Sequence, residues 1–112
     1  MEITFTTRKL AKTCNSMDRM VREFGADSAK KLGMRLQAIE AAECLAHLFT
    51  LPQCRCHPLT GDRKGQFAVD LKHPFRLVFE PRHDPMPLAD DGGIDLIRVT
   101  AVEVLAVEDY HR

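Results

Sequence analysis

Two runs of alternating apolar and polar residues decide the fold, and both lie in the stretch 66-QFAVDLKHPFRLVFE-80. Alternation with a period of two is typical of strands that bury one face. The predicted buried face consists of Phe67, Val69, Leu71, Phe75, Leu77 and Phe79. A turn is expected between the runs, at Lys72-His73-Pro74. The stretch therefore predicts two antiparallel strands, residues 66–71 and 75–80.

Further strands are expected on both sides of this pair. Residues 56–59 predict a short strand, followed by a turn over residues 61–65, which begin and end with glycine. The valine-rich residues 97–108 predict the last strand, and the alternating residues 2–6 predict a first one. Three prolines and the run Asp90-Asp91-Gly92-Gly93 predict a surface loop over residues 81–93.

The first half of the chain has helical periodicity instead. Apolar residues recur at spacings of three and four between residues 8 and 24, and they are Leu10, Cys14, Met17, Val21 and Phe24. Core packing is the preferred interpretation of this stripe over a groove for a partner. Gly25 is the expected C-cap, and Asp27 the N-cap of a second helix that continues toward Leu45. The two helices should form a hairpin.

The order of one strand, two helices and an antiparallel meander predicts an α+β fold. A single domain over residues 1–112 is expected, in which an N-terminal strand and a helical hairpin pack on an antiparallel sheet. With 45% hydrophobic and 29% charged residues, the composition is that of a folded domain. No apolar run approaches the roughly 20 residues of a membrane helix, and no signal peptide is visible. A cytoplasmic protein with its four cysteines reduced is therefore expected.

Charge is balanced overall but unevenly distributed along the chain. Residues 51–83 carry six basic and three acidic side chains, whereas residues 84–112 carry two basic and seven acidic ones. Enzymes of nucleic acids usually present a positive face. Only the middle of this chain supplies one, so tight binding to free RNA is not expected.

Strand parity predicts which side chains lie on the open face of the sheet. Burying an unpaired Glu103 would be costly, so its parity should face solvent. If the last strand stays regular, Asp109 and His111 share that parity. On the preceding strand the open set includes Arg76. Parity therefore predicts a histidine, a carboxylate and an arginine on one surface.

His57, Arg76, Asp109, Tyr110 and His111 are the residues best suited to chemistry. Cleaving RNA without a metal requires a base for the 2′-OH, a cation for the phosphate and an acid for the leaving oxygen. Histidine suits acid or base work, and arginine binds phosphate through two N–H groups. From residue types alone, an ordinary polar tail and a surface histidine remain the alternative.

Two other motifs are weaker candidates for a functional site. Cys54-x-Cys56-His57 has two thiols and an imidazole, but a structural zinc site needs four ligands and no second pair exists. Thiols in or near the core are preferred there, and neither is marked as a nucleophile. Arg63 and Lys64, in the turn over residues 61–65, are candidates to bind phosphate; a turn with solvated charges is the alternative. No metal or cofactor is expected.

Taken together, these motifs resemble the HigB-like branch of the RelE/ParE toxins. The similarity lies in the run from His57 through Gly61 to Gly65, in Phe75-Arg76-Leu77, and in the terminal Glu108-Asp109-Tyr110-His111. The helical hairpin before an antiparallel sheet matches as well, so the resemblance spans nearly the whole chain.

The resemblance implies a type II toxin that cleaves mRNA on the translating ribosome. It also implies a cognate antitoxin partner, of the helix-turn-helix, HigA-like kind. Carried over, His57 and His111 are the acid–base pair, Tyr110 stacks on a base or positions a proton, Asp109 orients a histidine, and Arg76 binds the scissile phosphate. The alternatives are a ParE-like toxin that poisons gyrase and a degenerate member that only binds its antitoxin.

Overall fold

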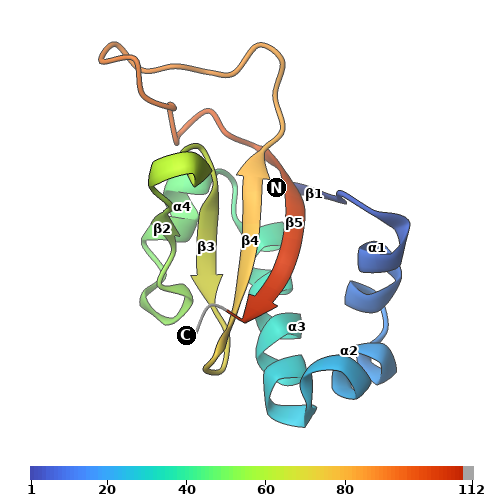
Figure 1. Cartoon of the computed structure of the whole chain (residues 1–112). Coiled ribbons are helices and arrows are strands. Elements are labelled where there is room, and N and C mark those ends of the chain that lie inside the picture. Colours follow the sequence, from blue (N-terminus) through green and yellow to red (C-terminus); the bar gives the residue numbers. More distant parts are fainter. Residues whose placement is uncertain (110–112) are drawn as a thin grey trace.

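The chain folds into a five-stranded sheet covered on one face by helices (Figure 1). The computed structural model describes residues 1–109. The strand order is β1-β5-β4-β3-β2, and the strands are β1 (Glu2–Phe5), β2 (His57–Pro58), β3 (Phe67–Asp70), β4 (Phe75–Pro81) and β5 (Ala101–Asp109). The helices are α1 (Arg8–Cys14), α2 (Met17–Phe24), α3 (Ala26–Ala41) and α4 (Leu45–Phe49), with 3-10 turns η1 (Pro52–Cys54) and η2 (Gly61–Arg63). This confirms the predicted α+β class.

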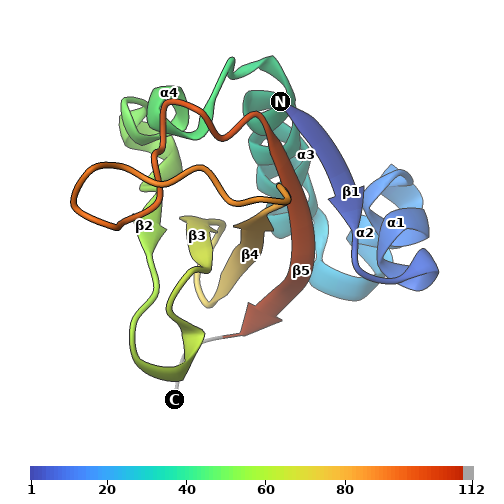
Figure 2. The ribbon, with the colours of Figure 1, turned by 90° about the horizontal axis from the view of Figure 1, so that it is seen from above.

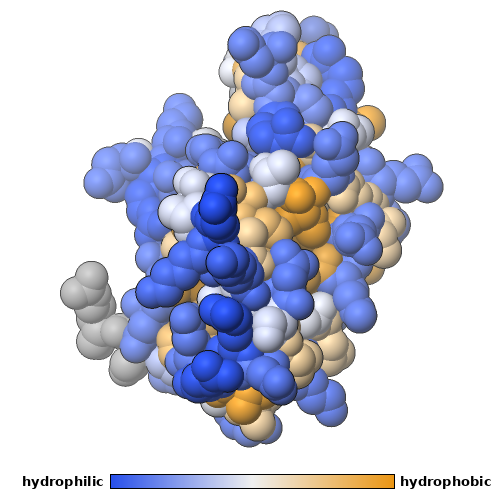
Figure 3. Space-filling model, turned by 90° about the vertical axis from the view of Figure 1, so that its right-hand side faces the viewer, coloured by the Kyte–Doolittle hydropathy of each residue, from blue (hydrophilic) through white to orange (hydrophobic). Residues whose placement is uncertain are grey.

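The first helical stretch is broken in two, where a single helix was predicted. Ser16 begins α2 as its N-cap, because its hydroxyl accepts a hydrogen bond from the backbone N–H of Arg19. After the break, α2 buries a different residue from the ones predicted. Met20 is buried, whereas Met17 and Val21 are 50% and 40% exposed. The prediction of Met17 and Val21 as core residues was therefore wrong. Figure 3 views this side of the molecule and shows apolar atoms at the surface among hydrophilic ones.

Gly25 serves both neighbouring helices. It is the C-cap of α2, as predicted, and with φ 88° it also precedes α3, which begins at Ala26 rather than after Asp27. A positive φ of this kind is accessible to glycine at little cost. The tight connection packs α2 against α3, which confirms the helical hairpin. The second helix does not continue to Leu45, because α3 ends at Ala41 and α4 is a separate element.

The sheet is mixed, although a purely antiparallel one was predicted. β1 pairs with β5 in parallel, from Glu2 opposite Ala101 to Phe5 opposite Val104. All other neighbouring pairs are antiparallel. The first strand, β1, therefore forms one edge of the sheet and lies beside the last strand, β5 (Figure 2).

A β-bulge interrupts the pairing of β4 with β5. Phe79 lies opposite Val104 and Val78 opposite Ala106, so Leu105 has no partner across the ladder. An extra residue of this kind reverses the alternation of side chains beyond it. On the far side, Val107 pairs with the buried Leu77 and packs against the core.

The core lies between the sheet and α3. Fully buried side chains come from α3, α4 and the central strands, and they include Leu32, Ile39, Leu45, Leu48, Val69, Leu77, Phe79, Val102 and Val104. A long segment, residues 82–100, leaves the sheet after β4 and returns at β5 (Figure 1). No helix in the described part of the chain is both long and apolar enough to span a bilayer.

Candidate functional site

The face of the sheet opposite the helices carries the predicted phosphate-binding arginine. Cross-strand partners point to the same side of a sheet. The register therefore places Asp70, Arg76 and Glu108 in one row across β3, β4 and β5. The next row contains His57, Ala68, Val78 and Ala106. His57 and Arg76 thus share the open face, as predicted for Arg76.

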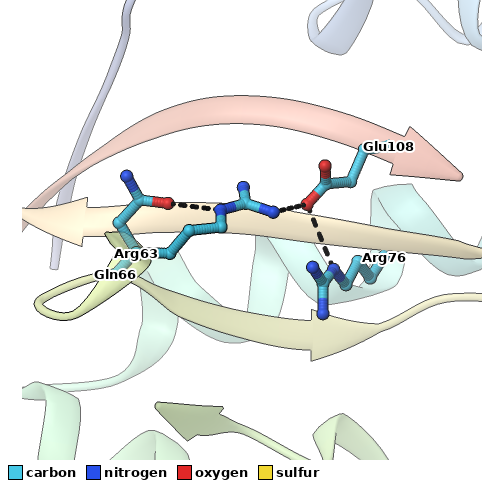
Figure 4. Close-up of polar contacts among 4 residues, drawn as sticks. All are labelled: Arg63, Gln66, Arg76 and Glu108. Atoms are coloured by element: carbon cyan, nitrogen blue, oxygen red, sulfur yellow. Dashed lines mark hydrogen bonds and ion pairs between the residues drawn. The ribbon is translucent and has the colours of Figure 1, made fainter. Parts of the chain in front are cut away.

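Glu108 joins two arginines on this face (Figure 4). Its Oε1 accepts hydrogen bonds from Arg63 Nη1 at 2.8 Å and from Arg76 Nε at 3.1 Å. Arg63 reaches across from η2, and its Nε donates to Gln66 Oε1 at 3.2 Å. The Arg76 side chain is 17% exposed and that of Glu108 28%, so the pairs are partly shielded from water. Two guanidinium groups are thereby held side by side, the arrangement expected of an anion site.

His57 is oriented by the backbone beside it. Its Nδ1 lies 2.7 Å from the carbonyl oxygen of Arg55. A carbonyl oxygen only accepts hydrogen bonds, so Nδ1 carries the proton and Nε2 of the neutral ring has a free lone pair. Neutral imidazole with an accessible Nε2 can take a proton from a hydroxyl group. With strands about 4.8 Å apart, the β2 position of His57 is about 10 Å from β4, which carries Arg76.

Asp109 lies on the opposite face from the one predicted. It pairs with Phe75, whose ring packs on Phe24 of α2 at a centroid distance of 5.5 Å. The bulge at Leu105 is the cause, because it shifts Ala106 and Glu108 to the open face and Val107 and Asp109 to the helix face. The carboxylate beside Arg76 therefore belongs to Glu108. Tyr110 and His111 lie outside the described residues.

Lys64 does not join the arginines. It lines a hollow of about 790 Å³, together with residues of α4, of the turn and of the long segment 82–100. That set is Phe49, Pro58, Leu59, Thr60, Gly61, Gly65, Phe67, Asp91, Gly92, Gly93, Ile94 and Leu96. Of the two basic residues predicted in the turn, Arg63 alone takes part in the network on the open face.

The cysteines near His57 are protonated thiols. Burial raises the pKa of Cys54, and burial is also the main cause that raises the pKa of Cys56 to about 12. A protonated thiol is a poor nucleophile and a poor metal ligand. Among residues 1–109, no three histidine, cysteine or acidic side chains are grouped so that they could hold a metal ion.

Slow alkylation of Cys14 and Cys56 is a direct expectation. Burial, together with the charge of Glu23, raises the pKa of Cys14 from 9.0 to about 11, and the pKa of Cys56 rises from 9.0 to about 12. At pH 8 their thiolate fractions should be lower than those of free cysteine by about 100-fold and about 1000-fold. Iodoacetamide labelling of the native protein, followed by peptide mass spectrometry, measures this. Labelling of Cys56 at the rate seen in urea would contradict it.

Strand parity assigned Glu108 to the wrong face of the sheet. Glu108 was included in the terminal motif, but regular alternation assigns it to the helix face. The bulge at Leu105 is what moves Glu108 to the open face. The sequence does not indicate this bulge, because Val104-Leu105-Ala106-Val107 is typical of a regular strand.

The strand order and the helical hairpin on one face of the sheet define the class of fold. The same fold is found in solved structures of YoeB and YoeB/ParE toxins. The YoeB–YefM complex from Staphylococcus aureus is similar over 100% of this chain and 98% of that chain, with a TM-score of 0.55 and 15% identity. The YoeB dimer from the same organism has the same coverage, a TM-score of 0.55 and 16% identity.

A third similar structure is the YoeB/ParE toxin from Agrobacterium tumefaciens. It covers 99% of this chain and 100% of that chain, with a TM-score of 0.54 and 12% identity. No protein-family model matches the chain, and no curated protein sequence does. At these identities the likeness establishes a shared fold.

Proposed function

We propose that this chain is the toxin of a type II toxin–antitoxin pair and an endoribonuclease that cleaves mRNA on the translating ribosome. The observation that carries the proposal is the open face of the sheet. It combines a histidine whose Nδ1 is held by a backbone carbonyl, which leaves Nε2 as the ring nitrogen that can accept a proton, with two arginines held side by side. The fold shared with YoeB and ParE toxins supports it.

The proposed reaction needs no metal or cofactor. His57 Nε2 removes the proton of the ribose 2′-OH, and the 2′-oxygen attacks the neighbouring phosphorus. The bond from phosphorus to the 5′-oxygen breaks as a proton is delivered to that oxygen. The products are a 2′,3′-cyclic phosphate and a free 5′-hydroxyl. In the reading carried over from the HigB-like toxins, His111 supplies the proton, Tyr110 stacks or positions a proton, and Asp109 orients a histidine.

Arg76 and Arg63 stabilise the negative charge that develops on the phosphate. In the free protein Glu108 accepts hydrogen bonds from both. The scissile phosphate therefore replaces Glu108 as the partner of at least one guanidinium. Glu108 holds the two groups in position until the substrate arrives, which reduces the reorganisation needed during reaction.

A cognate antitoxin is the proposed partner, along with the ribosome and mRNA, in the cytoplasm. One of the similar structures is a toxin in complex with YefM, which supports an antitoxin partner for this chain. The expectation of a HigA-like, helix-turn-helix antitoxin rests on the resemblance of the terminal motif alone.

The test is induction of the protein in growing cells, followed by mapping of mRNA 5′ ends. We expect new 5′-hydroxyl ends within translated codons and arrest of growth. His111→Ala should abolish both while leaving the folded domain intact, measured by circular dichroism. Intact mRNA accompanied by DNA breaks would instead identify a gyrase poison. Neither kind of damage, with antitoxin binding retained, would identify a degenerate toxin.

A further inference from the structure

A buried arginine on α3 has unmatched hydrogen-bonding groups. Arg35 is 7% exposed, and its Nε donates to the backbone oxygen of Asp70 at 3.0 Å. Within residues 1–109 this is the only hydrogen bond of its side chain. No buried side-chain nitrogen or oxygen in the described part lacks a partner, so its Nη groups are open to solvent. A largely buried cation is costly unless an anion accompanies it.

The open side of Arg35 is a hollow rich in positive charge. The hollow measures about 480 Å³ and is lined by Asp27, Lys30, Lys31, Met34, Arg35, Gln53 and Lys72. Its one carboxylate is already engaged, because Asp27 accepts a hydrogen bond from Lys72 at 2.7 Å. That hydrogen bond, and then the charges of Lys72, Lys30 and Lys31, hold the pKa of Asp27 below its usual range. Four cations therefore surround one acid.

Asp70 connects this hollow with the candidate site. Asp70 accepts the hydrogen bond of Arg35 through its backbone, and its carboxylate pairs with Arg55 Nε at 2.8 Å. Arg55 and Asp70 in turn line a second hollow, of about 460 Å³, with Cys56 and His57. Asp70 thus contacts a residue of each hollow, Arg55 on the side of His57 and Arg35 on the side of α3. Residues distant in sequence line the two hollows, which is why charge counted along the chain did not reveal them.

We propose that the hollow at Arg35 binds a phosphate group of an RNA strand that extends beyond the cleavage site. Arg35 lies at its base as the directional donor, since a guanidinium donates two parallel hydrogen bonds to phosphate oxygens. Lys30, Lys31 and Lys72 surround the phosphate as mobile charges. The choice of RNA rests on the proposed function, whereas the anion site rests on the charges and contacts around Arg35.

The test uses an RNA that binds but cannot be cut. A fluorescein-labelled 2′-O-methyl RNA has no free 2′-OH, so its fluorescence anisotropy reports binding alone. The variant Lys30→Gln/Lys31→Gln removes two exposed charges, and Lys9→Gln/Lys12→Gln on α1 is the matched control. Losing two phosphate contacts should reduce the slope of log K against log salt by about 1.4. The control should keep the wild-type slope.

A variant of the buried arginine tests the base of the hollow. Arg35→Met should weaken RNA binding at least as much as the lysine pair, with thermal unfolding measured alongside. Equal binding by the lysine variant and its control would overturn the proposal. So would lysine-dependent binding of inorganic phosphate alone, or of phosphatidylglycerol vesicles alone. Failure of the wild-type protein to cleave mRNA on translating ribosomes would count against the proposed function and leave this result intact.

Discussion

Replacing His57 by alanine is expected to lower RNA cleavage by about 10²- to 10⁴-fold, the usual contribution of a general base. The reason is the fixed tautomer: with Nδ1 donating to the Arg55 carbonyl, Nε2 is the one ring nitrogen able to take a proton. The measurement is the rate of mRNA cleavage on purified ribosomes under single-turnover conditions.

The fold should tolerate this change, because the His57 side chain is only half-buried at the edge of the sheet. His73→Ala, which removes an exposed histidine from the turn between β3 and β4, is the matched control and should cleave at the wild-type rate. Unchanged cleavage by His57→Ala, with the ribosome saturated, would refute the assignment of the base.

The second large effect concerns stability. Phe79→Ala should lower the free energy of unfolding by about 3–5 kcal/mol, a large share of the 5–15 kcal/mol typical of a domain. Phe79 has no exposed surface, lies beside the bulge opposite Val104, and stacks on Phe67 at a centroid distance of 6.1 Å. A large cavity would remain at the centre of the sheet. Urea denaturation followed by circular dichroism measures the loss.

Leu88→Ala is the comparison for that measurement. Leu88 lies in the segment between β4 and β5 and is 53% exposed, so little apolar area is lost on truncation. The urea concentration at the midpoint of unfolding should be nearly the same for Leu88→Ala as for the wild type. A similar midpoint for Phe79→Ala would mean that the core between α3 and the sheet is not packed as described.

The class of fold could be predicted because its signals are local. Large apolar residues recur at every second position in 67–71 and 75–79, and the helical stripes have the correct period. The break at Ser16 was missed even though its signal was present, since serine is a good N-cap and Arg19 offers the N–H. The parallel pairing of β1 with β5 could not be predicted, because no local pattern distinguishes which edge a first strand joins.

The candidate site could be predicted in part. His57 and Arg76 share one face because β2, β3 and β4 pair in regular register, and Arg63 reaches the same face from η2. Parity failed at β5, where one unpaired residue, Leu105, exchanges the two faces. Residues 104–107 are all apolar, so no polar side chain near Leu105 indicates such a shift.

The bridge from Arg63 to Glu108 has a consequence for the order of synthesis. Arg63 and Arg76 leave the ribosome well before residue 108, yet each has its carboxylate partner only once β5 has inserted between β1 and β4. Until then β1 and β4 lack the strand that lies between them, and the Glu108 carboxylate does not yet join the two guanidinium groups. The pairing of both arginines with Glu108 is therefore a late event in synthesis, because it needs residue 108 and the assembled strand β5.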